Sequence, residues 1–351
     1  MGRKRIGVDI GSTAVRAAEL SMNGGPTLTR VAQTPLPAGA VQNGEVRDPK
    51  VVAEGLSELW KRGKFRSREV VLGVGNQRVV VREVSLPWLE DKELRQSLPF
   101  QVQEYVPIPV EEALLDYHVI EEFEQEGRRM VRLLLVAAQK VMIDQIVQAA
   151  ELARLRPVGL DLISFAIVRS AGSSGGIWGE GDEATDEAVI DVGADVTSIC
   201  VHSGGLPRFV RILPSGGRDV TAAVARAVGV SEDEADQLKR GDGDSPIGSA
   251  EDARQAALSS VGSFVDEIRS SLDFHLAQAP GTRIGKVRYT GGGSKLDGFS
   301  QLLEERMPAE VEQGRPFERV KPAVKMTDDL MAEAEPLLAV AVGLALPGGR
   351  G

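Results

Sequence analysis

Short runs of alternating apolar and polar residues open the chain and predict a meander of strands over residues 5 to 36, broken at "NGG" and "PLP". The next segment, "DPKVVAEGLSELWKRG", has an apolar stripe at helical spacing. Asp48 is its expected N-cap, Pro49 its first helical residue and Gly63 its end. Strand alternation returns in "EVVLGVGNQRVVVREVSLP". These patterns predict a strand-rich unit with one amphipathic helix packed against it.

A change of pattern near residue 86 predicts a compact α+β module that extends to residue 156. "WLEDKELRQSLPFQVQEYVPIP" has helical spacing but contains Pro99, which predicts a bend or a restart there. "LLDYHVIEEF" and "RRMVRLLLVAAQ" alternate as two strands around the turn "EQEG". "KVMIDQIVQAAELARL" carries its apolar residues on one helical face.

The segment from Ser170 to Glu187 is rich in Gly, Ser and acidic residues and has no period, which predicts a flexible connection. Beyond it, strands, a helical stretch, strands and a helix repeat the plan of the first half. The stripe in "EDARQAALSSVGSFVDEIRSSLDFHLAQ" predicts a long helix in which His275 packs against its surroundings rather than binding a ligand. The sequence therefore predicts an α/β protein of two lobes.

Length and composition agree with two lobes and exclude several classes of function. A chain of 351 residues exceeds the roughly 100 to 200 typical of one domain. A net charge of −10 with only 4% aromatic residues argues against nucleic-acid binding. The longest strictly apolar run, residues 337 to 346, has half of the about 20 residues that cross a bilayer, so no direct membrane insertion is expected. The lone Cys200 indicates a reducing compartment, and the three histidines lack zinc-site spacing.

Two similar segments, "VDIGSTAV" and "IDVGADVT", carry the candidate chemistry. In each, an apolar strand ends near an aspartate, and a glycine then opens a tight turn whose backbone N–H groups suit an anion. The first turn supplies Asp9, Gly11, Ser12 and Thr13. The second supplies Asp191, Gly193, Ala194, Asp195 and Thr197. One such segment alone is better explained as an ordinary turn, but one in each half predicts that both converge on a polyphosphate and its Mg²⁺.

A third segment, "VRYTGGGSKLDGF", predicts a strand, a glycine-rich loop and a helix that starts near Asp297. The loop residues Gly291, Gly292, Gly293 and Ser294 would let the backbone approach a flat ligand closely. A flexible loop without a ligand is the alternative. In this order and spacing, the three segments resemble the phosphate-1, phosphate-2 and adenosine segments of the actin, heat-shock chaperone and sugar-kinase superfamily.

This resemblance implies an actin-like (ribonuclease H-like) two-lobed fold that binds ATP and Mg²⁺. Asp9 and Asp191 would hold the metal and its water. The turns around Gly11, Ser12, Thr13, Arg16, Gly193, Ala194 and Asp195 would surround the phosphates, and the loop 291–294 would lie along the adenine.

Two further segments extend the likeness. "EADQLKR" resembles the ribose-contacting helix of bacterial actins, which implies Asp236 and Lys239, although an exposed helical charge pair explains the spacing as well. "GLDLISFAIVRS" resembles the first connecting helix and implies a catalytic Asp161 together with Asp191. Asp161 is one methylene shorter than the Glu or Gln of relatives, which implies slow ATP hydrolysis at most.

Nearly the whole chain resembles the PilM family of type IV pilus assembly proteins. "LPWLEDKELRQSLPFQVQEYVPIPVEEALLDYHVIEE" and "LLVAAQKVMIDQIVQAAELARLRPVGLDL" carry the likeness, which includes the substituted subdomain 1C shared with FtsA. FtsA-like proteins end in an amphipathic membrane helix, whereas this chain closes with "LALPGGRG". The resemblance implies subdomain 1A in 1–85, 157–172 and part of 328–346, 1C in 86–156, a flexible inter-lobe loop in 173–187, 2A in 188–215 and 285–327, and 2B in 216–284.

Membership of this family implies a cytoplasmic scaffold on the inner face of the cytoplasmic membrane. Its expected partner is the N-terminal cytoplasmic peptide of PilN, received in a groove beside subdomain 1C, with other pilus platform proteins or a second copy as further partners. An acidic, apolar-lined groove suits an extended peptide with basic flanks. The alternatives are a small-metabolite kinase, with Asp161 or Asp195 as its base, and an FtsA-like filament-forming protein.

Overall fold

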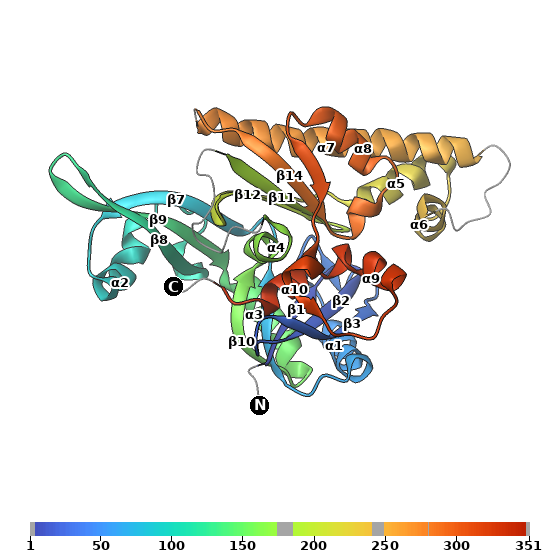
Figure 1. The fold of residues 1–351 in the computed structure, drawn as a ribbon, viewed down its shortest axis with the longest axis horizontal. Helices are drawn as coiled ribbons and strands as arrows, with labels where there is room; N and C mark the ends of the chain where they lie inside the picture. Colours follow the sequence, from blue (N-terminus) through green and yellow to red (C-terminus); the bar gives the residue numbers. More distant parts are fainter. Residues whose placement is uncertain (1–3, 174–184, 241–248, 280, 349–351) are drawn as a thin grey trace.

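Two sheet-centred lobes and a protruding module make up the protein (Figure 1). The computed structural model describes residues 4–173, 185–240, 249–279 and 281–348. Most of the segment expected to connect the lobes flexibly, residues 174–184, lies outside this range. Among the described helices, none is long and apolar enough to cross a membrane.

The first lobe is built on a six-stranded sheet in the order β10-β6-β1-β2-β3-β16. Its strands are β1 (Lys4–Ile10), β2 (Ala14–Ser21), β3 (Thr27–Pro35), β6 (Glu69–Val74), β10 (Arg156–Leu162) and β16 (Lys321–Pro322). The meander β1-β2-β3 is antiparallel, as the alternation predicts, and β6 runs parallel to β1. A small hairpin, β4 (Val41–Gln42) with β5 (Glu45–Val46), follows the meander.

Helices cover both faces of this sheet. One face packs against α1 (Pro49–Gly63) and α3 (Lys140–Leu152). The other packs against α4 (Ile163–Ala171) and α10 (Ala339–Ala345), with α9 (Asp328–Ala334) nearby in sequence. Asp48 caps α1 as predicted, accepting hydrogen bonds from the next turn. The left-handed residue that ends α1 is Lys64, not Gly63.

The second lobe repeats the plan on a five-stranded sheet in the order β13-β12-β11-β14-β15. Its strands are β11 (Asp186–Val192), β12 (Thr197–Ser203), β13 (Leu206–Leu213), β14 (Ile284–Thr290) and β15 (Glu310–Gln313). Its helices are α5 (Gly217–Val228), α6 (Glu232–Arg240), α7 (Ser249–Gln278) and α8 (Phe299–Arg306). Here too, an antiparallel meander lies beside a strand parallel to its first member.

His275 is buried in this lobe, as the apolar stripe predicts. Its ring stacks on Phe209 with 5.2 Å between the centroids, and its Nε2 lies 3.4 Å from Oδ2 of Asp186.

The module has its own core between a three-stranded sheet, ordered β7-β9-β8, and a helix. Its elements are β7 (Val79–Pro87), α2 (Asp91–Gln101), β8 (Ala113–Gln125) and β9 (Arg128–Gln139). The helix α2 continues through Pro99 to Gln101, so a restart at this proline is wrong, whereas a bend there stays a prediction. Residues 79–139 pack together as the module in the structure. Its first strand β7 starts before residue 86, and α3 shares the core of α1 in the first lobe instead.

Candidate functional site

The two turns found in the sequence have the same backbone construction. The N–H of Gly11 donates to the carbonyl of Ala14 at 3.1 Å, and the N–H of Gly193 donates to the carbonyl of Val196 at 3.0 Å. Each closes the hairpin that follows the first strand of its sheet, β1 in one lobe and β11 in the other. The repeated sequence therefore produces a repeated structure.

Asp9 and Asp191 lie close enough to influence one another. Burial raises the pKa of Asp9, and the Arg16 guanidinium, 3.4 Å from its Oδ2, opposes the rise. Burial and then the negative charge of Asp9 raise the pKa of Asp191 to about 7. Such an effect needs a short distance between the carboxylates. The ends of β1 and β11 thus lie near one another, and the convergence of both turns on one polyphosphate stays a prediction.

This carboxylate pair has the chemistry of a Mg²⁺ site. Two like charges in a buried place repel each other, and Arg16 is the cation that moderates them in the structure. A divalent cation would relieve the repulsion more fully. No group of three or more His, Cys, Asp or Glu side chains converges within the described residues. Two carboxylates suit Mg²⁺, which commonly binds one or two together with substrate phosphates and water.

The first turn exposes hydrogen-bond donors toward its surroundings. Thr13 is exposed at its tip, and Ser12 is buried beside it. Arg16 is positioned from β2, where it lies opposite Asp9 and donates through Nε to Oε1 of Gln33 at 3.0 Å. A phosphate at this turn would meet hydroxyl and guanidinium donors, which fits the role the resemblance assigns.

The second turn is held by a pair of glycines that the sequence interpretation missed. The N–H of Gly217 donates to the carbonyl of Gly193 at 3.0 Å, and the N–H of Arg218 donates to that of Ala194 at 2.8 Å. A Cβ on Gly216 would lie 2.6 Å from the Gly193 carbonyl oxygen. The segment "SGGRD" at the start of α5 was the available signal.

The loop Gly291 to Gly293 packs directly on this second turn. Gly291 has a φ of +90°, and a Cβ there would lie 2.4 Å from the Val192 carbonyl oxygen and 2.8 Å from Oδ1 of Asp191. The hydroxyl of Ser294 donates to the Gly291 carbonyl at 2.7 Å and closes the loop. The next helix starts at Phe299, slightly later than the predicted Asp297. Glycine is therefore required for close packing next to Asp191.

Lys239 reaches the start of α5, together with its predicted partner Asp236. Its Nζ donates to the Gly217 carbonyl at 3.1 Å and to Oγ1 of Thr221 at 2.6 Å, and it lies 2.7 Å from Oδ1 of Asp236. The second carboxylate oxygen of Asp236 pairs with Arg240 at 2.7 Å. The helix α6 is thereby attached to the start of α5, beside the glycines that hold the turn.

Asp195 joins the lobes instead of standing free at the turn. Its Oδ1 lies 2.9 Å from Nε of Arg218, and its Oδ2 accepts a hydrogen bond of 3.2 Å from the backbone N–H of Asn43. Asn43 is the tip of the β4–β5 hairpin in the first lobe, with a φ of 50°. This carboxylate is a contact across the cleft, a role that the sequence did not predict.

Asp161 has a partner away from the two turns. It lies in strand β10, because the connecting helix α4 starts only at Ile163. Its carboxylate forms an ion pair with Arg169 of α4, whose Nε donates to the Gly343 carbonyl of α10 at 3.1 Å. The expected position of Asp161 within a helix is wrong, and its expected catalytic role remains a prediction.

Comparisons with known proteins show the family and the fold. The family model described as "Type IV pilus assembly protein PilM" matches residues 7–348. The solved "PilM-PilN type IV pilus biogenesis complex" has a chain 30% identical to this one with a TM-score of 0.82, and 97% of each chain is covered. Cell division protein FtsA of Pseudomonas aeruginosa is 24% identical over 391 residues, which cover 99% of this chain and 89% of FtsA.

More distant structures share the fold alone. EutJ, an ethanolamine utilization protein from Carboxydothermus hydrogenoformans, is 15% identical with a TM-score of 0.58 over 99% of this chain and 91% of its own. MreB5 of Spiroplasma citri, solved with ADP, is 10% identical with a TM-score of 0.55 over 97% and 94%. The predicted actin-like fold is confirmed by these neighbours. With a family model matched over almost its full length, the chain belongs to the PilM family of type IV pilus assembly proteins.

Proposed function

We propose that this protein is an ATP-binding scaffold of the type IV pilus inner-membrane platform and that it docks the N-terminal cytoplasmic peptide of PilN. The observation that carries the proposal is the meeting of Asp9 and Asp191 between two identically built turns. The related solved complex contains PilM with PilN, and the distant relative MreB5 was solved with ADP.

Asp9 and Asp191 would hold Mg²⁺, which neutralises phosphate charge when the nucleotide is bound. The turns at Gly11 and Gly193 would direct backbone N–H groups toward the phosphates, and Arg16 would add a fork of donors. Lys239 would approach the ribose from α6, and the loop 291–294 would approach the adenine. Because Asp195 already links the lobes through Asn43, its proposed contribution is to lobe closure.

Hydrolysis would be slow at most. Asp161 is the residue expected to orient the attacking water, and its carboxylate is engaged by Arg169. A positioning error of about 1 Å can lower a rate by about 100-fold. A kinase acting on a small metabolite would need a free general base, yet both proposed bases, Asp161 and Asp195, are held in ion pairs. The scaffold is therefore the better supported function.

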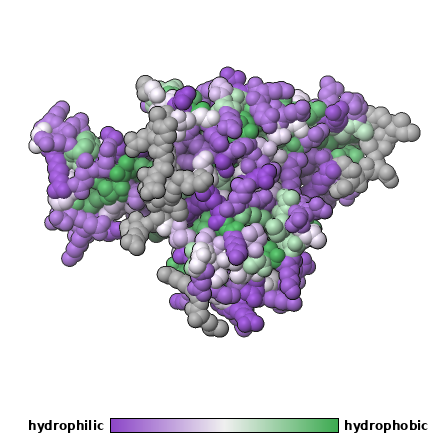
Figure 2. All heavy atoms as spheres, viewed as in Figure 1, coloured by the Kyte–Doolittle hydropathy of each residue, from purple (hydrophilic) through white to green (hydrophobic). Residues whose placement is uncertain are grey.

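The open edge of β10 is the proposed docking place for PilN. Among the described strands, β10 pairs only with β6, and its outer edge lies on the side of the module (Figure 1). Val158 and Leu160 on this strand are 53% and 36% exposed. Apolar residues also gather over the module in Figure 2. Leu114 of β8, a strand of the module, is 48% exposed. An extended peptide could add to such an edge through backbone hydrogen bonds and insert alternate side chains.

This proposal places the protein in the cytoplasm, at the inner face of the membrane, through its partner. Nucleotide would stabilise one relative orientation of the lobes, and that orientation would present the groove. A ligand shifts such an equilibrium only through its different affinity for the two states.

The test is the affinity of a synthetic PilN N-terminal peptide, measured by calorimetry with and without Mg-ATP. Wild type is expected to bind the peptide more tightly with Mg-ATP, whereas Asp191→Ala should bind it equally in both conditions. Glu124→Gln, an exposed carboxylate on the module, is the control and should behave as wild type. Equal affinities for wild type with and without nucleotide would remove the coupling, and no peptide binding at all would remove the scaffold function.

A further inference from the structure

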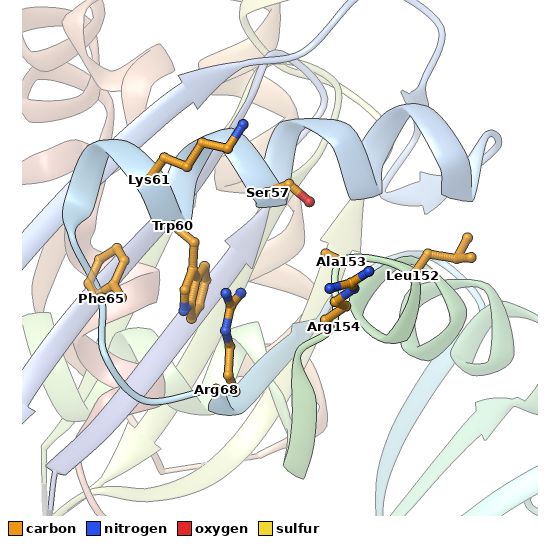
Figure 3. A pocket seen from close by; sticks show the side chains of 8 residues that line it. All are labelled: Ser57, Trp60, Lys61, Phe65, Arg68, Leu152, Ala153 and Arg154. Atoms are coloured by element: carbon orange, nitrogen blue, oxygen red, sulfur yellow. The ribbon is translucent and has the colours of Figure 1, made fainter.

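A small pocket lies where α1 and α3 end, away from the two turns (Figure 3). Its volume is about 250 Å³. Its lining residues are Ser57, Trp60, Lys61, Phe65, Arg68, Leu152, Ala153 and Arg154. None of these residues belongs to the proposed nucleotide site or to the edge of β10.

The floor of the pocket is aromatic and offers apolar surface. Trp60 and Phe65 are 3% and 8% exposed, with 5.0 Å between their ring centroids. The indole N–H of Trp60 already donates to the Ser67 carbonyl at 2.9 Å, so an incoming group meets the hydrocarbon part of the ring. Leu152 is 51% exposed at the α3 side. A buried floor with an exposed leucine beside it suits one apolar side chain of a partner.

The rim of the pocket is cationic. Lys61, Arg68 and Arg154 are all exposed, and Figure 3 shows Arg68 pointing toward α1 while Arg154 lies at the end of α3. Within the described part of the chain, Arg68 and Arg154 have no carboxylate within ion-pair distance. Residues 61 to 68 include five basic side chains and no acidic one, in a chain with a net charge of −10. Lys61 is paired with Glu58 at 3.9 Å, so Arg68 and Arg154 are the rim cations available to an incoming carboxylate.

The backbone on both sides of the pocket is strained. Lys64 after α1 has a φ of 51°, and Arg154 after α3 has a φ of 59°. Glycine or asparagine normally occupies this left-handed position after a helix. Attraction to the helix dipole explains a basic residue near a helix end, but it does not require the strained position itself. Both residues cap their helices through the backbone, and of the two only Arg154 lines the pocket.

We propose that this pocket binds an acidic segment of a partner protein, with one apolar residue inserted between Trp60 and Leu152 and flanking carboxylates paired with Arg68 and Arg154. Charge complementarity selects the occupant. The recessed floor argues against a flat anionic membrane, which would touch the cations without reaching the aromatic rings. A peptide rich in basic residues would be repelled by Arg68 and Arg154.

The test uses the full chain and a fluorescein-labelled peptide in which Leu-Phe is flanked on each side by three Asp or Glu residues. Anisotropy is expected to show saturable binding to wild type. Arg68→Glu and Arg154→Glu should each weaken it at least tenfold, and replacing Leu-Phe by Ser-Ser in the peptide should do the same. Arg226→Glu, an exposed arginine on α5, is the matched control and should leave the affinity unchanged.

Leu152→Ser leaves the charge of the protein unchanged. It should weaken binding of the peptide because it removes an apolar side chain that lines the pocket. Circular dichroism melts would establish that each variant is folded. Binding should be unchanged in Asp191→Ala, which separates this site from the nucleotide site. Absence of peptide binding to wild type, equal binding by the Arg68 and Arg154 variants, or binding only to vesicles of 30% phosphatidylglycerol would each overturn the proposal.

Discussion

The two glycine turns share a hydrogen bond but differ in what surrounds them. A Cβ on Gly11 would lie 3.2 Å from the Ala14 carbonyl oxygen, a tight but adjustable distance, whereas a Cβ on Gly193 would lie 2.6 Å from that of Val196. The first turn carries Ser12, Thr13 and Arg16 as donors. The second is enclosed by Gly216, Gly217 and the loop 291–293.

This difference indicates a division of roles between the lobes. The first turn contributes side-chain chemistry and has room to adjust to a ligand. The second is fixed by neighbouring backbone, and its Asp195 holds the tip of the opposite hairpin through Asn43. We infer that the second lobe provides a rigid frame against which the first lobe closes. The same short motif is therefore packed in two different ways.

The largest expected effect is a difference in stability between two variants, in which the glycine of the first or of the second turn is replaced by alanine. Gly193→Ala should lower the free energy of unfolding by about 2–3 kcal/mol, because its Cβ meets fixed backbone. Gly11→Ala should cost about 1 kcal/mol or less, since its nearest neighbours include the movable Arg16 side chain at 3.3 Å. Urea unfolding of both variants beside wild type measures the difference. Equal losses would show that the two turns are equally rigid.

A smaller effect should appear in the pH dependence of stability without nucleotide or metal. The pKa of Asp191 is raised by burial and by Asp9 to about 7, so between pH 4 and 7 the folded protein holds a proton that the unfolded chain has released. Its stability should therefore fall as the pH rises through this range. From pH 5 to pH 8 the free energy of unfolding should fall by about 2 to 3 kcal/mol more in wild type than in Asp191→Asn.

Glu124→Gln, far from the cleft on the module, is the control for this measurement and should keep the wild-type slope. Parallel profiles for wild type and Asp191→Asn would mean that neither burial nor Asp9 raises the pKa of Asp191 in the folded protein.

Much of the fold was predictable because local patterns agree with their packing. Alternation of apolar and polar residues predicts the antiparallel meanders. Asp48 predicts the start of α1, and the turn near Gly127 predicts the hairpin of β8 and β9. Pro99 lies in the last turn of α2, where a proline removes few hydrogen bonds, so the helix does not restart there. The predicted extent of the module, residues 86–156, includes α3, which shares a core with α1, since an apolar face does not reveal which core it joins.

The candidate site was only partly predictable for a related reason. The doubled motif revealed Asp9, Asp191 and their glycines. The partners of Asp161 and Asp195, in contrast, come from residues 8 and 152 positions away in sequence, and only tertiary packing brings Asn43 to Asp195. Gly216 and Gly217 carried a sequence signal, but their purpose becomes visible only when Gly193 is seen beside them.

The most direct measurement is a double-mutant cycle on Mg-ATP binding with Asp9→Asn, Asp191→Asn and the combined variant. If both carboxylates act on one magnesium ion, each single change should weaken Mg-ATP binding at least tenfold. The loss of binding free energy in the combined variant should then be much smaller than the sum of the two single losses. Calorimetry with Mg²⁺, repeated with EDTA, gives the values. Fully additive losses, or unchanged affinity in either single variant, would contradict a shared site between the lobes.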